Sequence, residues 1–415
     1  MNLIQQLELL GQYRANQADP RGKAHLPSGL PQPGLDQAIP GLEQDFAALV
    51  QTMDWQDLEA ERALLLHDLQ QALKLEHATI PPYLTALYTL SNKSSWHAQE
   101  VLRSVVVEEM LHMTLVANLI NALGGSPDTA AADFMPDYPS ALPFDVDGIK
   151  VNLLGFSRAA VEQGCAIERP RDIRASMLFQ ARPAPGELTI GEFYLILEAR
   201  LRAMVERHGE AVVFIGDTRR QVREGFYYDG AGATFPITDT VSALLALQTI
   251  RHQGEGVSDT IWTGNREQFK SFPEVAHYFR FNELLQGRLY QRGDTVQSGP
   301  TGKPFEVDWE AAIKIKPNSK LADYRAAPEI HAHALAFNTA YCDFLRQLNR
   351  AYNGEPALLQ TGIGCMFSLK ELILRLVNNP LPGSTEGWHA APTFEYAAPG
   401  AAVASPSTTL AQQAD

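Results

Sequence analysis

The stretch VEEMLHM (residues 107–113) decides how the rest of the chain is interpreted. If it is helical, Glu109 and His112 lie one turn apart on one face. A carboxylate and an imidazole at this Glu-x-x-His spacing bind metal in four-helix bundles that hold two metal ions. In such bundles two helices each supply one such pair, and the other two helices each supply one Glu. A single pair also occurs by chance on a solvated helical face, so the assignment depends on finding its partners.

Length, charge and cysteine content limit the class of protein. The chain has 415 residues, of which 45% are hydrophobic, as in a globular protein with a large core. Its formal net charge of −14 argues against nucleic-acid binding, which needs a basic surface. Cys165, Cys342 and Cys365 form no Cys-x-x-Cys pattern, so neither a disulfide framework nor a zinc or iron–sulfur site is indicated. Without a secretory signal or an uninterrupted apolar run of about 18 residues, we expect a cytoplasmic protein that binds no membrane.

Apolar residues recur at helical spacing over most of the chain, which predicts an all-α protein. The clearest stop is Gly124-Gly125-Ser126-Pro127, at the end of the helix that carries Glu109 and His112. The predicted helices, with approximate bounds, are 55–90, 96–123, 189–208, 239–254 with a continuation at 273–289 after an insertion, 330–352 and 356–377.

A long connection separates the second and third helices. This segment, 126–188, is rich in proline and contains one predicted strand at 149–154. A bundle with such a long second connection has the ferritin-type topology. We therefore predict a ferritin-like four-helix bundle with a long crossover, an interrupted fourth helix and extra C-terminal helices. The predicted organisation is a surface-wrapping or mobile segment (1–45), the di-metal bundle (46–290), a helical extension packed on it (291–397) and a disordered tail (398–415).

The first two helices offer three candidate ligands. Glu76 lies in an apolar run, where an unpaired carboxylate is costly unless something neutralises it. A metal ion would neutralise it, whereas a solvent-facing orientation or a hydrogen bond to Tyr83 would explain it without a metal. On the next helix, Glu109 shares a face with His112, while Glu108 turns toward the edge.

The third and fourth helices offer the other candidates. Glu192 stands in a Thr-x-x-Glu pattern, which is also a capping box, so it is either a ligand or a cap, with Glu198 as the alternative ligand. Glu274 and His277 form a second Glu-x-x-His pair, which raises the whole set above chance. Glu255, at the end of the first half of the interrupted helix, competes with Glu274 for the position facing His277.

Oxygen and nitrogen donors without thiolate suit iron or manganese. The predicted cofactor is therefore a di-iron centre, with manganese as the alternative metal. Mixed carboxylate–imidazole sites with open positions activate dioxygen, but a di-metal site also performs hydrolysis by generating hydroxide. The ligand set alone does not fix the reaction.

Five segments carry a family resemblance: LEHATIPPYL (75–84), EMLHM (109–113), IGEFY (190–194), QGEG (253–256) and HYFRF (277–281). Together they resemble the ferritin-like domain of the iminophenylpyruvate dimer synthases, which include enzymes that couple two tryptophan-derived imines in violacein- and rebeccamycin-type pathways. The resemblance covers roughly residues 55–290, and 337–396 is similar to the segment that follows that domain. It prefers Glu255 to Glu274 and prefers metal ligation to a cap for Glu192. The di-iron ligands that it implies are Glu76, Glu109, His112, Glu192, Glu255 and His277.

We expect a di-iron oxidoreductase that activates dioxygen or peroxide to oxidise or couple a small, aromatic, amino-acid-derived substrate. In this hypothesis Glu109 and one of Glu192 or Glu255 bridge the metals, with His112 and His277 as terminal ligands. The sequence contains no flavin, nicotinamide or iron–sulfur motif, so electrons would come from the substrate or from a separate donor protein. The aromatic residues expected to line a substrate pocket are Tyr83, Tyr88, Tyr194 and Phe281.

The main alternative is an iron-binding ferritin-like protein without turnover of an organic substrate. The long crossover and the C-terminal helices argue against it, because they obstruct the packing of a ferritin shell. A helical scaffold without metal is the third hypothesis. The sequence is compatible with a homodimer but names neither the substrate nor the native metal.

Overall fold

The computed structural model describes residues 57–90, 96–143, 148–170, 189–227, 234–256, 261 and 275–399. The predicted N-terminal segment 1–45, the tail from 400 onward and Glu274 lie outside the described residues. Within the described residues the chain is helical apart from one two-stranded sheet and isolated bridges, which confirms the predicted all-α class. The predicted domain boundaries stay predictions.

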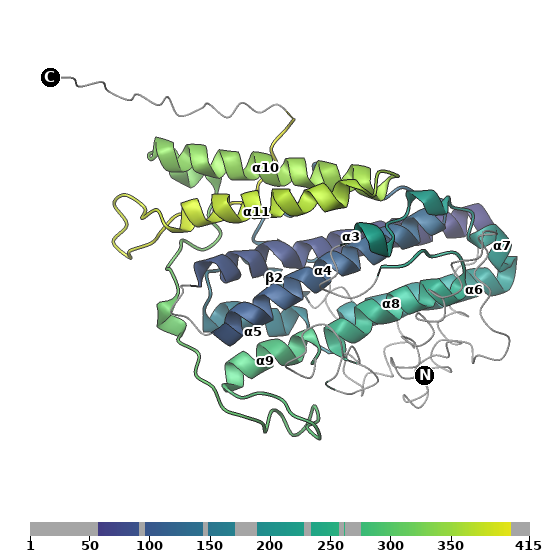
Figure 1. Cartoon of the computed structure of the whole chain (residues 1–415), viewed down its shortest axis with the longest axis horizontal. Helices are drawn as coiled ribbons and strands as arrows, with labels where there is room; N and C mark the ends of the chain where they lie inside the picture. Colours follow the sequence, from purple (N-terminus) through teal and green to yellow (C-terminus); the bar gives the residue numbers. More distant parts are fainter. Residues whose placement is uncertain are drawn as a thin grey trace.

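Four long helices form the predicted bundle. α3 packs against α4 and α6, and α8 packs against α6 and α4, so the apolar faces enclose a common core (Figure 1). Side-chain caps set three of the helix starts, because Asp57, Thr189 and Asp239 each accept a backbone N–H of the first turn. The bounds are α3 (Leu58–Thr89), α4 (Trp96–Ala122), α6 (Ile190–His208) and α8 (Thr240–Glu255).

The helix α4 is long and apolar enough to cross a membrane, but 89% of its most apolar window is buried inside the bundle. An apolar helix that is buried on all sides is typical of the core of a globular protein. Glu108, Glu109 and His112 are buried with it. Ionisable groups therefore lie in the middle of the core, which is costly unless they are paired or bind a metal.

The helix α3 continues through Pro81 and Pro82. A proline has no N–H, so Pro82 cannot donate to the carbonyl of Ala78, four residues earlier. The hydroxyl of Tyr138, in the crossover, donates to that carbonyl at 2.8 Å. A tertiary hydrogen bond therefore replaces the missing helical one and ties the crossover to α3.

We expect Tyr138→Phe to lower the free energy of unfolding by about 1–3 kcal/mol, because the buried carbonyl of Ala78 would lose its donor. Chemical denaturation measures this change. Tyr396→Phe, at an exposed tyrosine, is the matched control and should stay within about 0.5 kcal/mol of the parent. Equal effects of the two changes would contradict the role given to Tyr138.

The crossover contains a helix that the sequence did not predict, α5 (Arg158–Ile167). Ser157 caps it by accepting the N–H of Ala160 at 3.2 Å. The helix packs against α9, and Gly164 lies so close to the ring of Phe281 that a Cβ would come within 3.1 Å of it. The absence of a side chain at Gly164 brings the end of α5 close to the bundle core.

Helix α9 (His277–Gln286) follows α8 along the same edge of the bundle, as predicted for an interrupted fourth helix (Figure 1). Two C-terminal helices, α10 (Pro328–Tyr352) and α11 (Leu358–Val377), pack against each other and cover the α3–α4 side. The predicted strand at 149–154 is reduced to two residues. The remaining short elements are β1 (Ser140–Ala141), antiparallel to β2 (Lys150–Val151), α7 (Glu210–Val213), η4 (Thr218–Arg220), η5 (Glu224–Phe226), η6 (Trp309–Ala311) and η7 (Leu321–Tyr324).

Candidate metal centre

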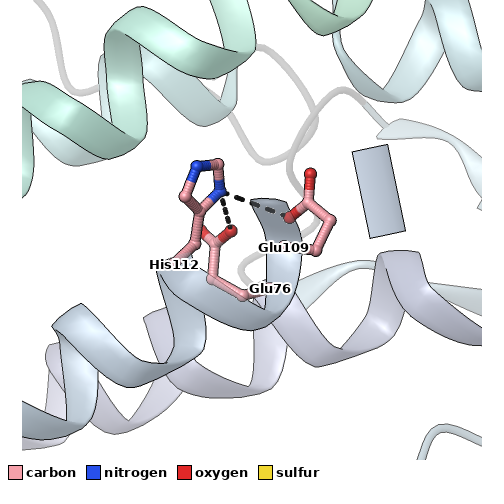
Figure 2. A group of neighbouring side chains, drawn as sticks. All are labelled: Glu76, Glu109 and His112. Atoms are coloured by element: carbon pink, nitrogen blue, oxygen red, sulfur yellow. Dashed lines mark hydrogen bonds and ion pairs between the residues drawn. The ribbon is translucent and has the colours of Figure 1, made fainter. Parts of the chain in front are cut away.

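The first group of ligand-type side chains joins α3 to α4. Nδ1 of His112 lies 3.1 Å from Oε2 of Glu76 and 3.5 Å from Oε2 of Glu109. Figure 2 shows this ring nitrogen facing both carboxylates. All three side chains are buried, and their ligand atoms lie close together. The fold thus brings together the three candidate ligands that the sequence analysis named on these two helices.

A second group uses the other side of the same glutamate. Nδ1 of His277, at the start of α9, lies 2.9 Å from Oε1 of Glu109 and 3.4 Å from Oε2 of Glu168. Glu168 is the residue directly after α5. These three side chains are also buried and close enough to share one metal ion.

Glu109 is the residue that the two groups share. Its Oε2 faces His112 and its Oε1 faces His277, so its two oxygens point into the two different groups. The two imidazole rings stack with centroids 5.6 Å apart. Each group therefore has one imidazole and one carboxylate of its own and shares Glu109 with the other group; these are the residues that would hold two metal ions.

Tyrosine hydroxyls donate hydrogen bonds to Glu76 and Glu168, the carboxylates that the two groups do not share. Tyr194 donates to Oε1 of Glu76, and Tyr83 donates to Oε1 of Glu168 at 2.6 Å. Burial raises the pKa of both tyrosines well above the usual value, so both hydroxyls keep their protons. The hydrogen bond that the sequence suggested between Glu76 and Tyr83 is replaced by this pattern.

Without a metal, protons on the imidazoles carry the positive charge. Burial raises the pKa of Glu76 to about 7. Burial would lower the pKa of His112, but Glu109 and Glu76 outweigh it and raise this pKa to about 10. Burial likewise favours neutral Glu109, yet His112 and His277 hold the pKa of this carboxyl below its usual range. Metal ligands must be deprotonated at the binding atom, so a metal here would displace these protons.

The surroundings of Nδ1 of His277 indicate whether a metal ion fits between the carboxylates. This Nδ1 is buried and within 3.4 Å of two carboxylate oxygens, yet it makes no well-formed hydrogen bond. A buried polar atom without a hydrogen bond calls for another partner, and a cation between the nitrogen and the carboxylates supplies one. Carboxylate and imidazole donors without thiolate fit iron or manganese. The donor set therefore fits two metal ions.

Glu192 does not join either group. It forms the capping box of α6, in which its Oε2 accepts the N–H of Thr189 at 2.8 Å. The alternative, Glu198, pairs with Arg202 at 2.8 Å. The geometry of Glu192 is thus that of a cap, and its role as a ligand stays a prediction.

Glu255 lies beside the centre rather than in it. Its carboxylate lies against Gly191, where a Cβ would come within 2.2 Å of Oε2, and its Oε1 is 3.8 Å from Nη1 of Arg251. It lines the cavity next to Glu76 and Glu109. Its competitor, Glu274, lies outside the described residues, so the choice between the two stays open.

Two functional candidates were missed from the sequence. Glu168 escaped because the crossover was interpreted as irregular, although Ser157 followed by a short amphipathic run was a signal for α5. Glu108 was placed at the edge of its helix, but it is 1% exposed and contacts Nε2 of His277 at 2.8 Å. Only the fold shows what these two carboxylates face.

A cavity borders the centre. Its wall combines the acidic ligands with apolar side chains and two arginines. The described residues that line it are Leu75, Glu76, Thr79, Glu109, His112, Glu168, Arg169, Ile190, Gly191, Tyr194, Ile250, Arg251, Gly254 and Glu255.

Two histidine–carboxylate groups that share a glutamate in a helical bundle resemble the ligand sets of bundles that hold two metal ions. A family model described as ferritin-like matches residues 69–286, more than half of the chain, and the chain belongs to this family. A crystal structure of a ferritin-like protein from Caulobacter vibrioides is similar, with 22% sequence identity and a TM-score of 0.48, over 80% of this chain and 97% of that chain. No curated protein shows a significant match. The narrower resemblance to the dimer synthases stays a prediction.

Proposed function

We propose that the protein is a di-iron oxidoreductase that uses dioxygen or peroxide to oxidise or couple a small, aromatic, amino-acid-derived substrate. The observation that carries the proposal is Glu109, whose two oxygens serve two separate histidine–carboxylate groups. Membership of the ferritin-like family supports it. A pair of iron ions held there would supply redox chemistry with dioxygen or peroxide.

Two tyrosines donate hydrogen bonds to the terminal carboxylates of the proposed centre. The hydroxyl of Tyr194 keeps its proton and donates it in a hydrogen bond to Oε1 of Glu76, and the hydroxyl of Tyr83 does the same to Oε1 of Glu168. These hydrogen bonds leave the Oε2 atoms of both carboxylates directed at the histidines. The tyrosines therefore orient the terminal ligands and place a proton donor beside each metal position.

The cavity wall supports the substrate class. Leu75, Ile190 and Ile250 give it an apolar side that suits an aromatic ring. Arg169 and Arg251 lie on the same wall, where Arg251 faces the carboxylates of Glu198 and Glu255 at 3.9 and 3.8 Å. The first substrates to test are therefore aromatic ones.

The test begins with anaerobic loading of the metal-free protein with Fe²⁺ and measurement of bound iron. We expect about two iron ions per chain and, on adding aromatic amino-acid-derived imines, oxygen or peroxide consumption that depends on substrate. The matched sample is the same protein without iron. Two bound ions with no substrate-dependent consumption over a panel of imines and amino acids would favour iron binding without turnover. No bound iron would overturn the di-metal assignment itself.

A further inference from the structure

The two histidines of the centre differ in what their outer ring nitrogens contact. Nε2 of His112 contacts the amide oxygen of Gln253 at 2.7 Å, whereas Nε2 of His277 contacts Oε2 of Glu108 at 2.8 Å. Since Nδ1 of each ring faces the inner carboxylates, Nε2 is the nitrogen that carries the proton when a metal takes Nδ1. One metal position is thus supported by a neutral acceptor and the other by a charged one.

Glu108 is held in place by a bidentate partner. Nη1 and Nη2 of Arg280 donate to its two oxygens at 3.0 and 3.1 Å. The guanidinium itself is held by the carbonyl of Val275 at 2.6 Å and by Oγ of Ser104 at 3.0 Å. Glu108 is 1% exposed and Arg280 is 7% exposed. The carboxylate therefore stays ionised and keeps one orientation toward His277.

A charged acceptor changes the metal-binding strength of the imidazole. A carboxylate that accepts the N–H of a ligating histidine fixes its tautomer and raises its basicity, and losing such a partner typically costs about 10–100-fold in metal affinity. Hydrogen bonds to an ionised acceptor are roughly twice as strong as those between neutral groups, so the amide of Gln253 does less for His112. The two positions are therefore chemically unequal even though their inner ligands match.

The two positions also differ in how many of their ligands line the cavity. Both terminal ligands of the first position, Glu76 and His112, line the cavity. Of the second position, only Glu168 is among the described residues that line it, and His277 has no exposed surface. The position with the weaker histidine support therefore has both terminal ligands on the cavity wall, whereas the other position has one.

We propose that Glu108, held by Arg280, is a positioning residue that makes the Glu168–His277 position the tight metal position and leaves the Glu76–His112 position exchangeable. The exchangeable position is then the one that meets molecules entering the cavity. This inference rests on the proposed di-metal centre, but not on any particular reaction.

The test uses Co²⁺ alone as the probe, titrated into the full-length metal-free protein without oxygen, with a competing chelator to measure affinity. We expect two binding steps whose dissociation constants differ by at least about tenfold. Glu168→Gln should remove the tight step and Glu76→Gln the weak one. The visible absorption of bound Co²⁺ follows each step independently of enzyme activity.

Two matched variants separate positioning from general structure. Glu108→Gln should weaken the tight step about 10–100-fold and leave the weak step unchanged. Gln253→Leu should weaken only the weak step. A merely structural role for either side chain would weaken both steps together, and thermal unfolding of the metal-free variants shows whether they are folded.

The outcomes distinguish the inference about unequal metal positions from the proposed function. Two steps of equal affinity, or equal weakening of both steps by Glu108→Gln, would overturn the inference while leaving the di-metal centre intact. No Co²⁺ or Fe²⁺ binding by the parent would instead overturn the proposed function. If Glu108→Gln does not fold, the order of the steps in Glu168→Gln and Glu76→Gln still decides which position is tight.

Discussion

Glu109→Gln is expected to remove both metal ions from the protein, the largest effect that we expect from one substitution. The two oxygens of Glu109 face different metal positions, so one change affects both groups at once. An amide has the same shape but no charge, and it offers only one good donor oxygen. Elemental analysis after Fe²⁺ loading should fall from about two ions per chain to near none. The stabilisation by metal, about 4 kcal/mol at a concentration of 1,000 times Kd, should disappear with them.

Glu192→Gln is the matched control, because it changes a buried glutamate in the same bundle. Glutamine also serves in a capping box, so the hydrogen bond to the N–H of Thr189 survives. We expect this variant to keep its metal. Loss of one ion from Glu192→Gln would show that Glu192 leaves its cap to bind metal, as the family resemblance implies. Retention of both ions by Glu109→Gln would contradict the shared ligand.

Arg280→Met is expected to lower the free energy of unfolding of the metal-free protein by about 3–5 kcal/mol. The change leaves the ionised carboxylate of Glu108 buried without its bidentate partner, and breaking a buried ion pair on one side has this cost. It also removes the hydrogen bonds that Arg280 makes to Val275 and Ser104. Chemical denaturation in the presence of a chelator measures the change.

A double variant shows whether the buried charge is the cause. Glu108→Gln combined with Arg280→Met removes both charges and should recover part of the lost stability, giving a coupling between the sites of about 0.5–3 kcal/mol. Arg219→Met is the surface control, because its pair with Asp217 is exposed. Additive losses in the double variant would mean that packing, and not charge, explains the effect of Arg280→Met.

The helices were predictable because their signals are local. Apolar periodicity places the four bundle helices within a few residues of their observed bounds, and in the structure Asp57, Thr189 and Asp239 cap three of the helix starts. The second Glu-x-x-His pattern pointed to His277, which the fold brings to Glu109. The helix bounds and the Glu-x-x-His spacing depend only on residues that are close in the sequence.

The rest of the centre depends on contacts between distant segments. Glu168 follows a ten-residue helix, α5, whose cap and short amphipathic run are a local signal, but its contact with His277 joins segments that are far apart in the sequence. The burial of Glu108 depends on Arg280, which lies on another helix. The capping box of Glu192 was visible in the sequence, but whether the carboxylate caps or binds metal is a question of geometry. Spacing identifies candidate ligands, and only packing assigns their partners.

The origin of the ligands has a kinetic consequence. Glu109, Glu168 and His277 come from α4, the residue after α5 and the start of α9, so these three segments must be assembled before a metal ion in the second group would meet all its donors. Contacts between such distant segments form late, because each closes a long loop. Interactions absent from the folding transition state slow unfolding without speeding folding. A metal ion bound there would therefore slow the unfolding of the native protein and would not speed its folding.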